Sequence, residues 1–194
     1  MNTQRPLEHA TKDILRKHYA QVSYRTALSA YRARPRWLRI PWATWILTLG
    51  TTLFWCFTAY QTALLAGARS IQAITSNILS NAIDVQSASD DALTTILIRY
   101  GAKENSLISQ GQYWRFITPI FLHVNLLHVG LNMLNLLMLG IFLERLMGSV
   151  RFIFIYMVTG VVSVIASFYF APNVISVGAS GAVFGLVGAY SIFV

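Results

Sequence analysis

Four long apolar runs occupy much of this sequence, and they restrict it to structures that are stable inside a lipid bilayer. The runs cover residues 42–66, 126–147 and 152–170, and a fourth begins at Ser180 and is still apolar at Val194. A helix needs about 20 apolar residues to cross the hydrocarbon core, where its backbone polar groups must be bonded internally. The runs therefore predict an all-α membrane protein, a polytopic bundle of transmembrane helices.

Composition and charge support the membrane interpretation. Charged residues make up 11% of the 194 residues, whereas soluble domains carry about 25%. The net charge of +8 comes mainly from the first 40 residues, which hold nine of the fifteen lysines and arginines. A basic block directly before an apolar run is a topology signal and attracts anionic lipids. We therefore expect the lipid bilayer, and no nucleic acid, as a partner.

The charge pattern also divides and orients the chain. We expect a basic cytosolic segment at residues 1–40 and a membrane domain at residues 41–194, in which residues 67–122 form a long external loop. Because positive charge favours the cytosol, the second and fourth runs both begin at the outer surface. Loops longer than about 15 residues usually contain structure of their own, so we expect short helices at residues 70–82 and 92–100.

Polar side chains stand at the outer start of two of these runs, and they are the candidate functional residues. Ser180 begins the fourth run within Gly178-Ala179-Ser180-Gly181. His128 and Asn132 lie near the start of the second run, with His123 upstream. Residues four apart project from one helix face, and the predicted topology puts that face at the depth of Ser180. Polar side chains inside a bilayer are costly and usually functional.

These residue types together suggest acyl-transfer chemistry. A serine hydroxyl is a nucleophile once a base activates it, and the imidazole of His128 and the amide of Asn132 can donate hydrogen bonds to an oxyanion. Each residue alone has a simpler explanation, since a membrane-helix serine usually serves packing and a histidine near a helix start is often interfacial. Gly181 and Gly185 predict close contact with another helix. Phe184 is either core filler or a brace for an aromatic base.

An ordered set of motifs resembles the rhomboid intramembrane serine proteases. The set comprises Gly111-Gln-Tyr-Trp114-Arg115, Thr118-Pro119, Phe121-Leu-His123, His128-x-x-x-Asn132, Glu144, Gly148-Ser149 and Gly178-Ala-Ser180-Gly181. It runs from about residue 101 to Val194, roughly half of the chain. The resemblance implies a rhomboid-like bundle with four of about six core helices present, and the short architecture suits a bacterial inner membrane.

The resemblance also implies a role for each candidate residue. Ser180 is the nucleophile that cleaves transmembrane protein substrates, and His128 and Asn132 form the oxyanion hole together with the Ser180 backbone N–H. His123 and Phe184 line the cavity, with Phe184 against the catalytic histidine. The structural motif residues are Trp114, Arg115, Gly178 and Gly181. The sequence has no nucleotide-binding or metal-ligand spacing, so we expect neither a cofactor nor a metal.

One departure from the family pattern concerns the catalytic base. The family uses a histidine on a later span, but the histidines here are at positions 9, 18, 123 and 128. We therefore expect the chain to be truncated within its fourth span and residues 1–194 alone not to cleave. The alternative is a catalytically inactive relative that binds transmembrane clients. A transporter or structural membrane protein is a third class, in which Ser180 would be dispensable and unreactive with fluorophosphonates.

Overall fold

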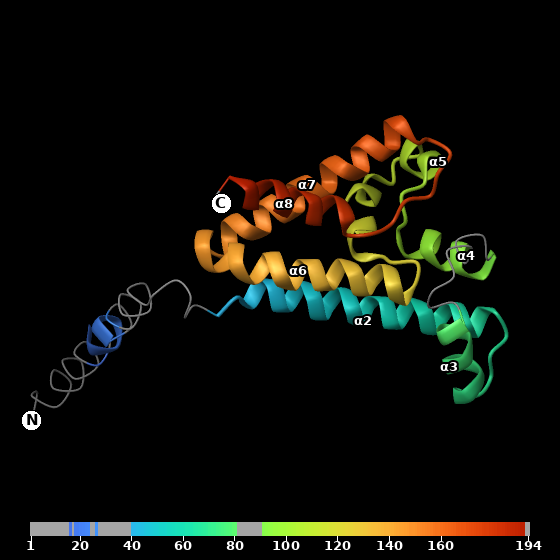
Figure 1. Cartoon of the computed structure of the whole chain (residues 1–194), viewed down its shortest axis with the longest axis horizontal. Helices are drawn as coiled ribbons and strands as arrows, with labels where there is room; N and C mark the ends of the chain where they lie inside the picture. The colour runs from blue at the N-terminus through green and yellow to red at the C-terminus, as the bar shows by residue number, and fades with distance from the viewer. Residues whose placement is uncertain (1–15, 17, 24–25, 27–39, 81–90, 193–194) are drawn as a thin grey trace, which may run out of the picture. The chain divides into compact units, whose positions relative to one another are not determined.

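The computed structural model describes residues 16, 18–23, 26, 40–80 and 91–192 (Figure 1). The chain forms two separate compact units, Met1–Arg39 and Ile40–Val194. Most of the basic segment predicted at residues 1–40 lies outside the described residues, although residues 18–23 are helical. All the candidate functional residues belong to the second unit.

The second unit is built from helices, as the sequence predicts. Its long helices are α2 (Trp42–Leu65), α6 (Leu126–Met147), α7 (Ser149–Phe170) and α8 (Ser180–Ser191). Between α2 and α6 stand the shorter elements α3 (Ile71–Ser80), α4 (Asp91–Tyr100), α5 (Asn105–Ser109), η3 (Tyr113–Phe116) and η4 (Thr118–Phe121). The two short helices expected in the long loop are thus confirmed as α3 and α4, although residues 81 and 82 lie outside the described part.

Two of the described helices, α6 and α7, are both long and apolar enough to cross a membrane, with 22 residues each. At 1.5 Å per residue, such a helix spans about 33 Å, slightly more than the hydrocarbon core. α2 has 24 residues, but six of them are threonines, which lower its mean hydropathy. α8 is a shorter apolar helix. The spans predicted at α2 and α8 therefore stay predictions as membrane spans.

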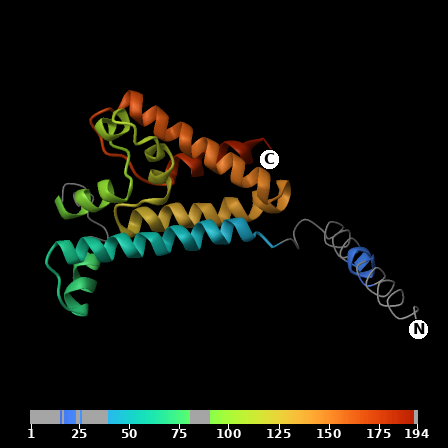
Figure 2. The same ribbon diagram turned by 180° about the vertical axis from the view of Figure 1, so that it is seen from behind.

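The long helices pack into a bundle around one apolar core. α2 and α6 lie side by side in both views, and α7 runs obliquely to them (Figures 1 and 2). α8 packs against both α6 and α7. The largest fully buried side chains of this core are Ile120, Leu136, Leu143, Phe152, Tyr156 and Leu186.

A buried carboxylate joins three helices at the end of the bundle away from the candidate site. Glu144 Oε1 accepts from Ala43 N at 2.9 Å and from Ser149 Oγ at 2.6 Å. Its Oε2 accepts from Thr44 N and Thr44 Oγ1, both at 2.7 Å. Thr44 and its neighbour begin α2, so the carboxylate bonds backbone N–H groups that a helix start leaves without internal acceptors. This contact fixes the register of α2 against α6 and α7.

Candidate active site

Ser180 occupies the first position of α8. The helix begins after Ala179, and its first internal hydrogen bond runs from Val183 N to Ala179 O at 2.9 Å. The backbone N–H of Ser180 therefore has no acceptor within the helix, and the helix dipole favours negative charge at this end. The Ser180 side chain is exposed in the described structure. The start of α8 thus presents a hydroxyl and an N–H donor at one point.

His128 approaches Ser180 across Gly178. A Cβ built on Gly178 would stand 2.7 Å from His128 Nε2 and 3.9 Å from Ser180 Oγ. Gly178 also has a φ of +122°, a backbone conformation that side-chain-bearing residues rarely adopt. Glycine is therefore required here for two reasons, and its missing side chain lets the imidazole approach the segment that carries the serine.

His123 holds the residue before the serine. Its Nε2 accepts a hydrogen bond from Ala179 N at 3.3 Å, and its ring lies 4.9 Å from that of His128, centroid to centroid. The His123 side chain is only 1% exposed. Burial, aided by the charge of His128, lowers the pKa of His123 to about 3. The ring is therefore neutral at ordinary pH, which leaves Nε2 free to accept from Ala179.

Asn132 lies one turn below His128 and is buried. Its Nδ2 donates to His128 O at 2.9 Å, so the amide bonds the turn that carries the imidazole. The start of this helix is fixed by Asn125, whose Oδ1 accepts from His128 N at 2.8 Å. Asparagine is a preferred residue at this capping position. The sequence reasoning missed Asn125, although an asparagine directly before an apolar run is a recognisable helix-start signal.

The glycines of α8 bring it against α7. A Cβ on Gly181 would overlap the Ser163 side chain, and one on Gly185 would overlap Thr159. The close helix contact predicted from the G-x-x-x-G pair is present, and α7 is its partner. Phe184, one turn below Ser180, is 74% exposed. Among the described residues it therefore has little packing, and its proposed role beside a catalytic histidine stays a prediction.

A cleft of about 370 Å³ opens beside Ser180. Part of its lining carries hydroxyl groups, from Ser163, Ser167, Ser176 and Ser180. The remaining lining residues are Pro119, Val124, Val164, Ile175, Val177 and Gly178. His123 was predicted to line the cavity, but it lies outside this lining and contacts the serine segment through Ala179 instead. The cleft has space for water next to the Ser180 hydroxyl.

Trp114 and Arg115 lie on η3, in the loop structure around the site. Arg115 Nη1 donates to Ile98 O at 2.8 Å and to Ala102 O at 2.9 Å, and its guanidinium is 4.6 Å from the Trp114 ring centre. The Trp114 side chain packs against Gly101, where a Cβ would overlap it. These contacts join the end of α4 to η3. The structural role that the family resemblance gives to both residues stays a prediction.

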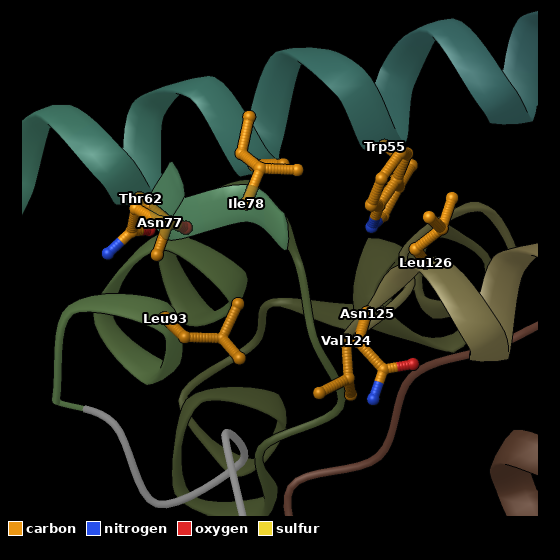
Figure 3. Close-up of a pocket in the computed structure, with 9 residues that line it drawn as sticks. Trp55, Thr62, Asn77, Ile78, Leu93, Val124, Asn125 and Leu126 are labelled. Carbon is orange, nitrogen blue, oxygen red and sulfur yellow. The ribbon is translucent and has the colours of Figure 1, made fainter. Parts of the chain in front are cut away.

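A small pocket lies beside the α6 start (Figure 3). Its volume of about 30 Å³ suits one or two water molecules. Trp55 and Thr62 of α2, Asn77 of α3 and Leu93 of α4 line it together with Asn125. The helix start that carries His128 is therefore bordered by two elements of the loop region, α3 and α4, and by α2. Within the described residues no cluster of three or more His, Cys, Asp or Glu side chains could hold a metal ion.

The fold and this site define a helical membrane protein with a serine at a helix start and two histidines beside it. Residues 110–194 match the family profile of the Rhomboid domain. Together with the relatives below, this match is consistent with the rhomboid family.

The chain is similar to curated proteins from bacteria and plants. It is 51% identical over 96 residues to "Rhomboid protease GluP" of Bacillus subtilis (strain 168), covering 50% of this chain and 19% of that protein. It is 38% identical over 84 residues to "Putative rhomboid protease YdcA" of the same organism, covering 43% of this chain and 42% of that protein. It is 31% identical over 169 residues to "RHOMBOID-like protein 5" of Arabidopsis thaliana, covering 81% of this chain and 54% of that protein.

The matched regions therefore span between about a fifth and about half of these relatives. No solved structure matches the chain significantly.

Proposed function

We propose that this chain carries the nucleophile and the oxyanion-stabilising groups of an intramembrane serine endopeptidase that cleaves transmembrane protein substrates. The observation that carries the proposal is the approach of His128 and Ser180 beside Gly178. His128 Nε2 lies 2.7 Å, and Ser180 Oγ lies 3.9 Å, from the position that a Cβ on Gly178 would occupy. The starts of α6 and α8 thus bring together the His128 imidazole, the Ser180 hydroxyl and the N-terminus of α8, and these groups suit acyl transfer.

The reaction follows from these groups. Ser180 Oγ attacks the carbonyl carbon of the peptide bond, and the carbonyl oxygen becomes an oxyanion. The Ser180 N–H, the His128 imidazole and the Asn132 amide donate to that oxygen, and donors in a water-poor site stabilise it strongly. The proton of the hydroxyl passes to a base and then to the leaving amine. The family resemblance assigns the base to a histidine on a later span, outside residues 1–194.

We further propose an orientation for the domain at residues 41–194. The basic segment at residues 1–40 lies in the cytosol, the loop at residues 67–122 lies outside, and the site opens toward the outer surface. The proposal rests on the concentration of lysine and arginine before α2. A bacterial inner membrane is the proposed location.

The test uses the full-length native protein in membranes, with a fluorophosphonate probe and a transmembrane reporter substrate. Ser180→Ala should abolish both cleavage and probe labelling while the protein stays folded. Ser191→Ala, at the far end of the same helix, is the matched control and should keep both activities. Cleavage retained by Ser180→Ala would refute Ser180 as the nucleophile. A wild-type protein that neither cleaves nor reacts with the probe would instead indicate an inactive relative that binds clients.

A further inference from the structure

We infer that Lys103 is a positioning residue for Ser180, because its buried ammonium group holds the segment 171–179 that leads into α8. The inference rests on the proposed role of Ser180 as nucleophile. Lys103 belongs to the long loop, where a lysine side chain would ordinarily be exposed. The structure places this side chain in the interior instead, with 0% exposure.

Lys103 bonds the segment at three positions. Its Nζ donates to Ala171 O at 2.6 Å and to Val174 O at 2.9 Å. Its backbone N donates to Ser176 O at 3.0 Å, and Ser176 N donates back to Lys103 O at 3.2 Å, which forms an isolated antiparallel bridge. One residue of the first loop therefore holds the start of this segment and two positions in its middle third.

The next residues of the segment are held by the site itself. Gly178 N donates to Pro119 O at 2.8 Å, and Ala179 N donates to His123 Nε2 at 3.3 Å. Three residues separate Ser176 from Ser180, so a shift at the Lys103 contacts reaches the hydroxyl with little slack. The two sets of contacts together set the entry angle of α8 and the position of Ser180 Oγ.

The chemistry of Lys103 favours a positioning role over simple space filling. Burial lowers the pKa of Lys103, and the charge of Glu104 opposes this shift. Burying an ammonium group is costly, and a methionine of similar length would fill the space without that cost. A methionine has no donors for the two carbonyls, whereas the lysine has three. Ala171 also caps the end of α7, where a cation is favoured by the helix dipole.

The first test compares Lys103→Met with wild type in the full-length protein by fluorophosphonate labelling. The final amplitude counts competent sites, and the rate reports how well each Ser180 is placed. A displaced nucleophile can lose about 10- to 100-fold in rate, so we expect the rate per site to fall by that factor.

Two further variants serve as controls for this test. Lys103→Arg keeps the donors and should recover most of the lost labelling rate. Arg99→Met, which removes an exposed cation of the same loop, is the matched control and should leave the rate unchanged. An unchanged rate per site with lower amplitude would show a merely structural role and overturn the inference.

The second test does not depend on catalysis. Hydrogen exchange is measured in a Ser180→Ala background, with and without Lys103→Met. We expect faster exchange at the amides of Ser176 and Gly178 and unchanged exchange in α6. Unchanged exchange at Ser176 and Gly178 would overturn the inference even if the protease proposal stands. Conversely, Lys103→Met could speed exchange at these amides while the wild-type protein never reacts with the probe. That pair of results would reject the protease proposal alone. If Lys103→Met does not fold, Lys103→Gln, which keeps a shorter donor, is measured with the same expectations.

Discussion

Gly178→Ala tests the link between the serine segment and His128. The added Cβ would stand 2.7 Å from Nε2 and 2.8 Å from Cε1 of the imidazole. An ordinary contact needs about 3.5 Å, so the ring or the segment must move by roughly 0.7–0.8 Å. A displacement near 1 Å at a catalytic group can cost about 10²-fold in rate. We expect kcat/KM of the full-length protein to fall by about 10- to 100-fold.

The same substitution has a cost in stability that can be measured without catalysis. An alanine at φ +122° should destabilise the fold by about 1–3 kcal/mol through backbone strain alone, and the contact with His128 adds to this. Gly111→Ala is the matched control, since Gly111 has a φ of +98° but nothing within 4 Å of its Cβ position. Gly178→Ala should therefore lower the free energy of unfolding more than Gly111→Ala does.

A double-mutant cycle isolates the contact. His128→Ala removes the ring that the new methyl group meets, so Gly178→Ala should cost less in that background, with a coupling of about 0.5–3 kcal/mol. Equal costs in both backgrounds, or a cost no larger than that of Gly111→Ala, would contradict the geometry described for Gly178 and His128.

Three further variants test other parts of the fold and site. Glu144→Gln turns one acceptor oxygen into an amide donor that faces two donors. At about 1–3 kcal/mol for each unsatisfied group, it should lower the free energy of unfolding by about 2–6 kcal/mol. Asp91→Asn on the surface is the control and should change the free energy of unfolding little. Asn132→Ala should reduce kcat by up to about 10²–10³-fold, because one oxyanion donor is lost. Asn135→Ala, which changes an exposed asparagine of the same helix, is the control and should leave kcat unchanged. An unchanged kcat in Asn132→Ala would mean that other groups hold the oxyanion. Gly185→Leu should prevent α8 from packing on α7, and a normal thermal transition would disprove that contact.

Part of this protein could be predicted from the sequence because membrane helices leave local signals. The second run, at residues 126–147, coincides with α6, and the fourth begins at Ser180 in both the prediction and the structure. The G-x-x-x-G pair of α8 predicted a close helix contact because small residues are what such contacts require. The family motifs predicted the residues of the candidate site, since these are short patterns of residue type and spacing.

The tertiary structure decided what depends on long-range contacts. Lysine side chains are ordinarily exposed, and only the packing of the first loop on the end of α7 buries Lys103 against backbone carbonyls. The partners of Glu144 on α2 lie about a hundred residues away in the chain, and no local pattern identifies them. The sequence alone indicated the apolar helices, the helices α3 and α4 and the candidate residues, because hydrophobic runs and motif spacing are local, whereas α5, η3 and η4 were not predicted. The approach of His128 to Gly178 and the hold of Lys103 on residues 171–179 arise only when distant segments pack, so only the folded structure reveals them.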